Sequence, residues 1–382
     1  MAPLTNVEEK ILTQKVSSQL SKTPYACSAL TKLNALDVDA NVSNTVIVKA
    51  STEFVAINRD FPLDISRCLF ESSILQALIG FPRTVATLKG FVKVAVPKVY
   101  YCLTDQQPYT QILQDFTGTV DLTTILESPS VGLSLPASSP TSIGYAMGSW
   151  LRMFHTWTSE PAQGVLLSDA GANEGMRKLK CLITYDSFIE ILERHPEVIE
   201  DHLDTLKEIQ MIMRHEFECS PIEEGAERCL IHSDFWGGNI LLADGPWRKS
   251  DDPDRPSALY IIDWENVQYS HRAVDIGGIL ADLYERNHFK DVQASITIIK
   301  GFIEGYGKLS EELAYRVAIH AGVHLICWYY RRDRNAPLPY PLPKVLAALT
   351  LGRDLILKGW AKDRSWLKMS ILASMFADQN LI

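Results

Sequence analysis

The chain has 382 residues, of which 46% are hydrophobic and 22% charged, and its formal net charge is −9. This composition is that of a globular protein rather than a disordered one, and the length suits two domains or one two-lobed unit. No apolar stretch reaches the roughly 18 residues of a membrane span, and the acidic balance argues against general nucleic-acid binding, so we expect neither a membrane nor a nucleic-acid partner.

The first part of the chain has the pattern of a small sheet that carries one main helix. Helical spacing of apolar residues predicts a short amphipathic helix at 7–20 and a longer one at 64–79. Runs rich in β-branched and aromatic residues predict strands at 45–49, 94–103 and 109–113. We therefore expect an N-terminal unit, residues 1–113, built on a small sheet with one prominent helix.

From residue 114 onward helical periodicity dominates, so residues 114–382 are expected to form a larger and mostly helical unit. Short strands are predicted at 230–231, 240–242 and 259–262. Residues 127–141 and 244–257 have loop composition, the second as a hairpin loop. The predicted helices are 143–156, with a small-residue face at Gly144, Ala146 and Gly148, then 184–194, 198–217, 273–285, 291–306, 310–332, 342–358 and 364–376.

The cysteines and histidines do not have the spacing of a metal centre. Seven cysteines are scattered without a CxxC pair, which is typical of reduced thiols in a cytosolic protein. The nine histidines form no HExxH motif. Residues 1–9 contain two acids and no apolar signal segment, so the expected location is cytoplasmic.

The most informative stretch is 231–242, IHSDFWGGNILL, which is followed by IIDWE at 261–265. Asp234 can accept a proton from a substrate hydroxyl and orient it. The oxygens of Asn239 and Asp263 are hard ligands suited to Mg²⁺, which neutralises charge between nucleotide phosphates. Two glycines, 237 and 238, let the loop turn tightly enough for Asp234 and Asn239 to face one pocket.

These motifs resemble those of the aminoglycoside phosphotransferase and choline kinase branch of the protein-kinase-like fold, especially fungal small-molecule kinases of the methylthioribose-kinase-like and hydroxytryptamine-kinase type. The resemblance runs from about residue 30 to 375. It implies an α+β, two-lobed fold with a small antiparallel-sheet N-lobe and a helical C-lobe. It also implies that Asp234 is the catalytic base, that Asn239 and Asp263 bind Mg²⁺, that His232 braces the catalytic loop 231–242, and that Asp275 caps the helix after the metal strand 259–265 and holds the loop.

The N-terminal part supplies the nucleotide-binding residues that the resemblance implies. Lys49, at the end of a strand, is similar to the lysine that grips the α- and β-phosphates of ATP, and Glu71 is similar to the helix glutamate that holds it. The segment 112–118 matches the hinge, where adenine would meet the backbone of Gln114 and Phe116. One departure is the segment 36–41, which has no glycine and contains two acids where the family has a glycine-rich phosphate loop.

The acceptor site is expected between the catalytic loop and the helical half. Trp236 is either an aromatic wall or a packing residue, and Trp264 is expected to pack. His320, His324 and Trp328 share one face of the predicted helix 310–332 and form either a pocket wall or part of the core. Residues 331–334 form either an anion site or a solvated helix end, and Glu265 and Asp282 favour a cationic amine.

These observations predict an ATP- and Mg²⁺-dependent phosphotransferase that phosphorylates a hydroxyl of a small metabolite and acts as a monomer or homodimer. The glycine-free segment 36–41 leaves an alternative open, a kinase-like protein that binds a ligand or partner without transferring phosphate. An unrelated metal-dependent hydrolase is disfavoured because no histidine ligands accompany the carboxylates.

Overall fold

The computed structural model describes residues 31–34, 45–55, 58–81, 84–87, 90–104, 109–128, 139–218, 227–243, 257–329 and 339–376. Several expectations lie outside these residues: the helix at 7–20, the segment 36–41, most of the loop 244–257, and the arginine-rich segment 331–334. The backbone of Trp328 is described as helix, but its side chain is not.

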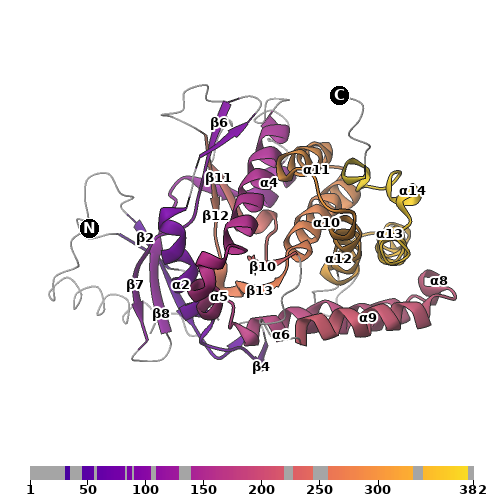
Figure 1. Ribbon diagram of the computed structural model, residues 1–382, viewed down its shortest axis with the longest axis horizontal. Helices are drawn as coiled ribbons and strands as arrows, with labels where there is room; N and C mark the ends of the chain where they lie inside the picture. Colours follow the sequence, from indigo (N-terminus) through magenta and orange to yellow (C-terminus); the bar gives the residue numbers. More distant parts are fainter. Residues whose placement is uncertain are drawn as a thin grey trace.

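The N-terminal sheet has the strand order β1-β2-β8-β7, and all its pairings are antiparallel. Helix α2 (Arg67–Ala77) packs beside it and is continued by one 3-10 turn, η1 (Leu78–Gly80) (Figure 1). The predicted strands at 45–49 and 109–113 and the predicted helix at 64–79 are confirmed, although the helix begins later than expected. The strands are β1 (Thr31–Asn34), β2 (Thr45–Ser51), β7 (Val99–Leu103) and β8 (Tyr109–Gln114), and a small hairpin, β3 (Phe54–Val55) with β4 (Asn58–Pro62), lies at one side.

A second sheet joins early and late parts of the chain. Its order is β5-β6-β12-β11-β9, with a parallel pairing between β6 and β12. The single strand predicted at 94–103 is therefore wrong: it is two strands in two sheets, separated at Pro97, which has no N–H to donate to a ladder. The strands are β5 (Thr84–Thr87), β6 (Gly90–Ala95), β9 (Thr119–Asp121), β11 (Ile240–Ala243) and β12 (Ser257–Ile261). The second sheet pairs β6, which precedes residue 113, with β12, which follows it, so the sheets do not divide at that residue. The expected domain boundary at residue 113 stays a prediction.

Four long helices form the centre of the helical part, which lies opposite the N-terminal sheet in Figure 1. They are α10 (Ala273–Lys290), α11 (Gln293–Tyr306), α12 (Glu311–Tyr329) and α13 (Leu342–Trp360). Helix α4 (Ser139–Thr158) packs closely on α11, and the predicted small-residue face makes this approach. A Cβ at Gly144 would lie 2.2 Å from the carbonyl oxygen of Ile298, so no larger residue fits there.

The expected α+β architecture is observed, with differences of detail in the helical part. The predicted helix at 198–217 is two helices, and that at 364–376 is one short helix followed by a 3-10 turn. Helices α3, α5 and α6 and strand β13 were not predicted. The remaining elements are α3 (Leu122–Glu127), η3 (Pro161–Gln163), α5 (Gly164–Ala170), α6 (Glu174–Ile183), α7 (Tyr185–Glu193), α8 (Pro196–Ile199), α9 (Leu203–Glu218), β10 (Arg228–Ile231) paired with β13 (Gln268–His271), α14 (Arg364–Leu367) and η6 (Ala373–Met375).

The helices of the described part of the chain are too short or too polar to cross a bilayer.

Candidate active site

The loop that contains Asp234 is fixed at its start by a buried carboxylate. Asp275, in the first turn of α10, accepts hydrogen bonds from the backbone N–H of His232 at 2.8 Å and of Ser233 at 2.7 Å. Burial tends to raise the pKa of Asp275, but the hydrogen bond from the His155 ring and the contacts with His232 outweigh it and lower this pKa. Asp275 thus holds the loop, as expected.

The expected capping role of Asp275 is wrong. Helix α10 begins at Ala273, and its N-cap residue, Arg272, makes no side-chain capping bond. Asp275 lies inside the first turn, and its two oxygens point to the catalytic loop instead of the free N–H groups of its own helix.

Asp234 and Asn239 lie together, as the spacing predicted. The side-chain Nδ2 of Asn239 donates to the carbonyl oxygen of Asp234 at 2.9 Å and to its Oδ2 at 3.0 Å. His232 lies beneath them: its Nδ1 accepts from the N–H of Asp234, and its Nε2 donates to the carbonyl oxygen of Ile262. The imidazole therefore connects the loop to the residue before Asp263, which is the bracing contact that we expected.

Asp263 is brought to the same place by the pairing of β11 and β12. Ile240 pairs with Ile261, and the N–H of Ile262 donates to the carbonyl oxygen of Asn239 at 3.0 Å. Asp263 follows directly, with a left-handed backbone (φ 63°) that turns the chain out of the strand. Its side chain is 38% exposed, so the carboxylate is accessible to a ligand.

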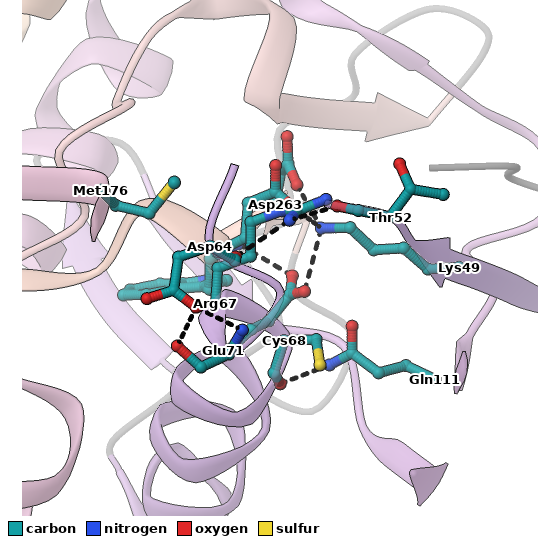
Figure 2. A network of polar contacts seen from close by, with 12 residues as sticks. Lys49, Thr52, Asp64, Arg67, Cys68, Glu71, Gln111, Met176 and Asp263 are labelled. Atoms are coloured by element: carbon teal, nitrogen blue, oxygen red, sulfur yellow. Dashed lines mark hydrogen bonds and ion pairs between the residues drawn. The ribbon is translucent and has the colours of Figure 1, made fainter. Parts of the chain in front are cut away.

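Lys49 connects the N-terminal sheet to this carboxylate (Figure 2). Its Nζ lies 2.9 Å from Glu71 Oε2, 2.6 Å from Asp263 Oδ1 and 3.0 Å from Glu265 Oε2. The second oxygen of Glu71 accepts the N–H of Trp264 at 3.0 Å, so Glu71 connects α2 directly to the segment after β12.

The charges of this buried cluster shift its pKa values. Burial tends to lower the pKa of Lys49, but Asp263, Glu265 and Glu71 together raise it well above its ordinary value. Burial raises the pKa of Glu71, while the charge of Lys49 opposes that rise. Burial also acts to raise the pKa of Asp263, but Lys49 outweighs it and lowers that pKa. The lysine is therefore charged over the whole physiological pH range.

Glu265, which we expected at the acceptor site, lies in this cluster instead. Its Oε2 contacts Lys49 and also lies 3.4 Å from Nε of Arg67, a fully buried arginine that donates to the carbonyl oxygens of Thr52 and Asp64. Sequence reasoning missed Arg67. Its position four residues before Glu71 on the same helical face was the available signal.

The other acceptor candidates lie around the loop. The indole of Trp236 covers Gly238, where an added Cβ would lie 2.3 Å from the ring. His324 is 7% exposed, and its Nδ1 would lie 3.8 Å from a Cβ added at Gly278. The hydroxyl of Tyr185 hydrogen-bonds to Nδ1 of His320, which therefore belongs to the core.

Trp264 is fully buried, as its expected packing role requires. Its ring centroid lies 4.5 Å from that of His232 and 5.2 Å from that of Phe154.

The expected hinge residues follow β8. The N–H of Gln114 donates to the carbonyl oxygen of Lys98 at 2.9 Å. The ring of Phe116 stacks on Tyr260 with centroids 3.9 Å apart, and its carbonyl oxygen accepts from the hydroxyl of Thr119 at 2.6 Å. The N–H of Gln114 and the carbonyl oxygen of Phe116 therefore already have protein partners. An adenine at the hinge would bond to the other backbone groups of residues 112–118.

Comparisons with known proteins show a family and similar chains. The family model described as "Phosphotransferase enzyme family" matches residues 88–316. The chain is 27% identical over 394 residues to phosphotransferase FrzJ of Cladobotryum sp, with 97% of this chain and 98% of that one covered. It is 20% identical over 293 residues to 4-hydroxytryptamine kinase of Psilocybe cubensis, with 74% and 73% covered.

Among solved structures, an ADP-bound aminoglycoside phosphotransferase is 14% identical to this chain, with a TM-score of 0.44 and coverage of 89% of this chain and 98% of that one. The family model spans more than half of the sequence and includes both the loop that contains Asp234 and the segment that contains Asp263. The chain therefore belongs to the phosphotransferase enzyme family.

Proposed function

We propose that this protein is an ATP- and Mg²⁺-dependent kinase that transfers the γ-phosphate to a hydroxyl group of a small metabolite. The observation that carries the proposal is the convergence of Asp234, Asn239 and Asp263 at one place, with Lys49 bonded to Asp263 from the opposite sheet. A carboxylate base, an amide and a second carboxylate, with a buried lysine beside them, are the groups that phosphoryl transfer needs.

The donor set fits a magnesium ion. Because Nδ2 of Asn239 is used on Asp234, its Oδ1 is the atom available to a cation. Asp263 shares one oxygen with Lys49 and retains the other. Both are oxygen ligands, which Mg²⁺ prefers. When bound there, the ion would supply charge neutralisation between the nucleotide phosphates.

The protein residues then have separate roles. The Asp234 carboxylate accepts the proton of the acceptor hydroxyl, whose oxygen forms a bond to the γ-phosphorus as the bond from that phosphorus to the ADP oxygen breaks. Asn239 holds Asp234 in place through two hydrogen bonds. Lys49 binds the α- and β-phosphates, and Glu71 orients Lys49. The carbonyl oxygen of Gln114 and the N–H of Phe116, which are not the groups bonded to Lys98 and Thr119, would position the adenine.

The two lobes of the proposed enzyme are residues 1–113 and 114–382, with the site between them, and it acts as a monomer or homodimer. We propose a cytoplasmic location, which is supported by the seven scattered cysteines of the sequence, since none of them forms a CxxC pair. The name of one relative, 4-hydroxytryptamine kinase, makes hydroxylated aromatic amines reasonable first acceptors to test.

The test is turnover of Mg·ATP with a panel of hydroxyl metabolites, measured as ADP release and as phosphate incorporation. We expect Asp234→Asn to lower kcat by about 10²-fold or more, because a general base contributes at least that much. Glu304→Gln, on α11, is the matched control and should be silent. Wild-type turnover that Asp234→Asn leaves intact would refute the proposed role of Asp234.

The non-catalytic alternative is supported by the acids Asp37 and Asp39 in the glycine-free segment. The same assay decides between the two functions. A protein that is thermally stabilised by an acceptor or by ATP, but transfers no phosphate to any of the panel, would favour the binding protein over the kinase.

A further inference from the structure

A second buried carboxylate on helix α10 contacts the catalytic loop. Asp282 is 1% exposed, and its Oδ2 accepts the backbone N–H of Gly237 at 3.0 Å. It lies seven residues after Asp275, so both carboxylates are on the same face of α10. Asp275 holds the beginning of the loop at residues 232 and 233, and Asp282 holds its end.

Asp282 is itself held by Arg286, which in turn is held by Glu127. Its Oδ1 lies 2.8 Å from NH2 of Arg286, one turn later on α10. NH1 of Arg286 lies 2.7 Å from Oε1 of Glu127, at the end of α3. A buried carboxylate is costly unless it is paired and hydrogen-bonded, and here both of its oxygens have partners. Asp282 is therefore directed at the loop and at Arg286, which corrects the expectation that its charge favours a cationic acceptor.

Asp282 contacts the N–H of Gly237, which lies at a tightly packed position of the catalytic loop. A Cβ at Gly237 would lie 2.7 Å from Oγ1 of Thr123 and 3.1 Å from Oδ2 of Asp282, so only glycine fits between α3 and α10. Gly237 opens the 3-10 turn η4 (Gly237–Asn239), in which the N–H of Asn239 bonds to the carbonyl oxygen of Trp236 at 3.0 Å. The Gly237 N–H and the Trp236 carbonyl belong to one peptide group, so Asp282 holds the group to which the Asn239 backbone is bonded.

We propose that Asp282 is a positioning residue that sets the orientation of Asn239 by anchoring the Gly237 N–H, with Arg286 and Glu127 holding Asp282 in place. This inference rests on the proposed function in one respect, the role of Asn239 as a Mg²⁺ ligand. The series of contacts begins at Glu127, at the end of α3, passes through Arg286 and Asp282 on α10, and ends at Gly237 in the catalytic loop.

Three variants test the proposal. Asp282→Leu removes the acceptor and the charge at similar volume, Asp282→Asn keeps an oxygen that can accept the Gly237 N–H, and Arg286→Met removes only the support. The first measurement is amide hydrogen exchange of a peptide that covers residues 232–240, which needs neither substrate nor metal. We expect exchange at 236–239 to be at least about ten times faster in Asp282→Leu, little changed in Asp282→Asn and intermediate in Arg286→Met.

The second measurement is the Mg²⁺ concentration that gives half-maximal turnover. Loss of a group that orients a metal ligand typically costs about 10- to 100-fold in metal affinity or activity. We expect a rise of that size in Asp282→Leu and a much smaller one in Asp282→Asn. The matched control is Glu216→Gln. Glu216 on α9 forms a 2.6 Å ion pair with Arg316 on α12, and this pair is exposed to the same degree as the pair of Arg286 with Glu127. The Glu216→Gln variant should change neither quantity.

The outcomes are distinguishable. A lower melting temperature in Asp282→Leu with wild-type exchange at 236–239 and an unchanged Mg²⁺ midpoint would show a purely structural role and overturn the proposal. If Asp282→Leu does not fold, the same result in Arg286→Met overturns it. If the wild-type protein transfers no phosphate, the proposed function fails, whereas the exchange measurement still decides whether Asp282 anchors the loop.

Discussion

At the residue scale, the site is organised around one cation that faces three carboxylates. Lys49 is 3% exposed and contacts Glu71, Asp263 and Glu265, while Arg67 shares Glu265 with it. A phosphate ligand would compete with these carboxylates for Lys49. The second contact of Glu265, with Arg67, leaves that carboxylate a partner when Lys49 turns to a nucleotide.

This arrangement predicts that Lys49→Met destabilises the fold as well as removing activity. Removing one partner of a buried ion pair typically costs about 3–5 kcal/mol, because the remaining charge has no compensation. We expect a loss of that order in the free energy of unfolding, measured by urea denaturation, and partial recovery in the double variant Lys49→Met/Glu265→Gln, which removes one of the three anionic partners of Lys49.

The matched control is Lys344→Met. Lys344 pairs with the mostly exposed Asp291 at 3.6 Å, and such pairs contribute about 0–1 kcal/mol. Equal losses of unfolding free energy in the two methionine variants would contradict the view that the Lys49 cluster is a buried charge centre.

At the scale of elements, the helical part depends on the close contact between α4 and α11. Glycines of each helix lie against the backbone of the other: Gly148 meets Phe302, and Gly305 meets Tyr145. Helix α4 also contacts β5, β6 and β10, so the same contact helps to place α11 relative to the second sheet and the β10–β13 pair.

Gly148→Ala should therefore destabilise the protein, although alanine is the better helix former. Its Cβ would lie 2.1 Å from the carbonyl oxygen of Phe302, a backbone atom that cannot move without shifting α11. Overpacking of this kind typically costs about 1–3 kcal/mol. Thermal denaturation checks it, with Gly80→Ala as the control, because a Cβ at Gly80 has no atom within 4 Å. A Gly148→Ala protein as stable as wild type would show that the helices can separate at no cost.

At the scale of the whole molecule, the C-terminal core contains buried histidines that are neutral. Burial lowers the pKa of His271 to about 3, and the neighbouring Arg316, Arg228 and Arg272 add to this shift. Burial also lowers the pKa values of His155 and His320. Unfolding exposes all three to water, where their pKa returns to about 6.5.

The unfolded state therefore binds more protons than the folded state below pH 6.5, and stability should fall as the pH falls from there. Each pH unit between the two pKa values of one such histidine costs about 1.4 kcal/mol. We expect the free energy of unfolding to decrease steeply between pH 6.5 and 5, and less steeply in His271→Gln. A flat profile in the wild-type protein would refute the prediction.

Local spacing predicted most of the elements and the proximity of Asn239 to Asp234. The loop between Asp234 and Asn239 could be predicted because five residues with two glycines leave the chain few ways to turn. The pairing of strands that lie far apart in the sequence could not be predicted in this way. The parallel contact of β6 with β12 joins residues about 165 positions apart, and Pro97 gave only a local signal of the break before β7.

The sequence by itself determined the chemistry of the site, because residue type and short-range order decide which groups can accept a proton or bind a hard cation. It also determined the α+β character, through periodicity. Only the tertiary structure decided the partners of the charged groups. It placed Glu265 on Lys49 and Arg67, and Asp282 on Gly237 and Arg286 instead of a substrate. Such pairings depend on burial and on distances between remote segments, and neither is encoded in local spacing.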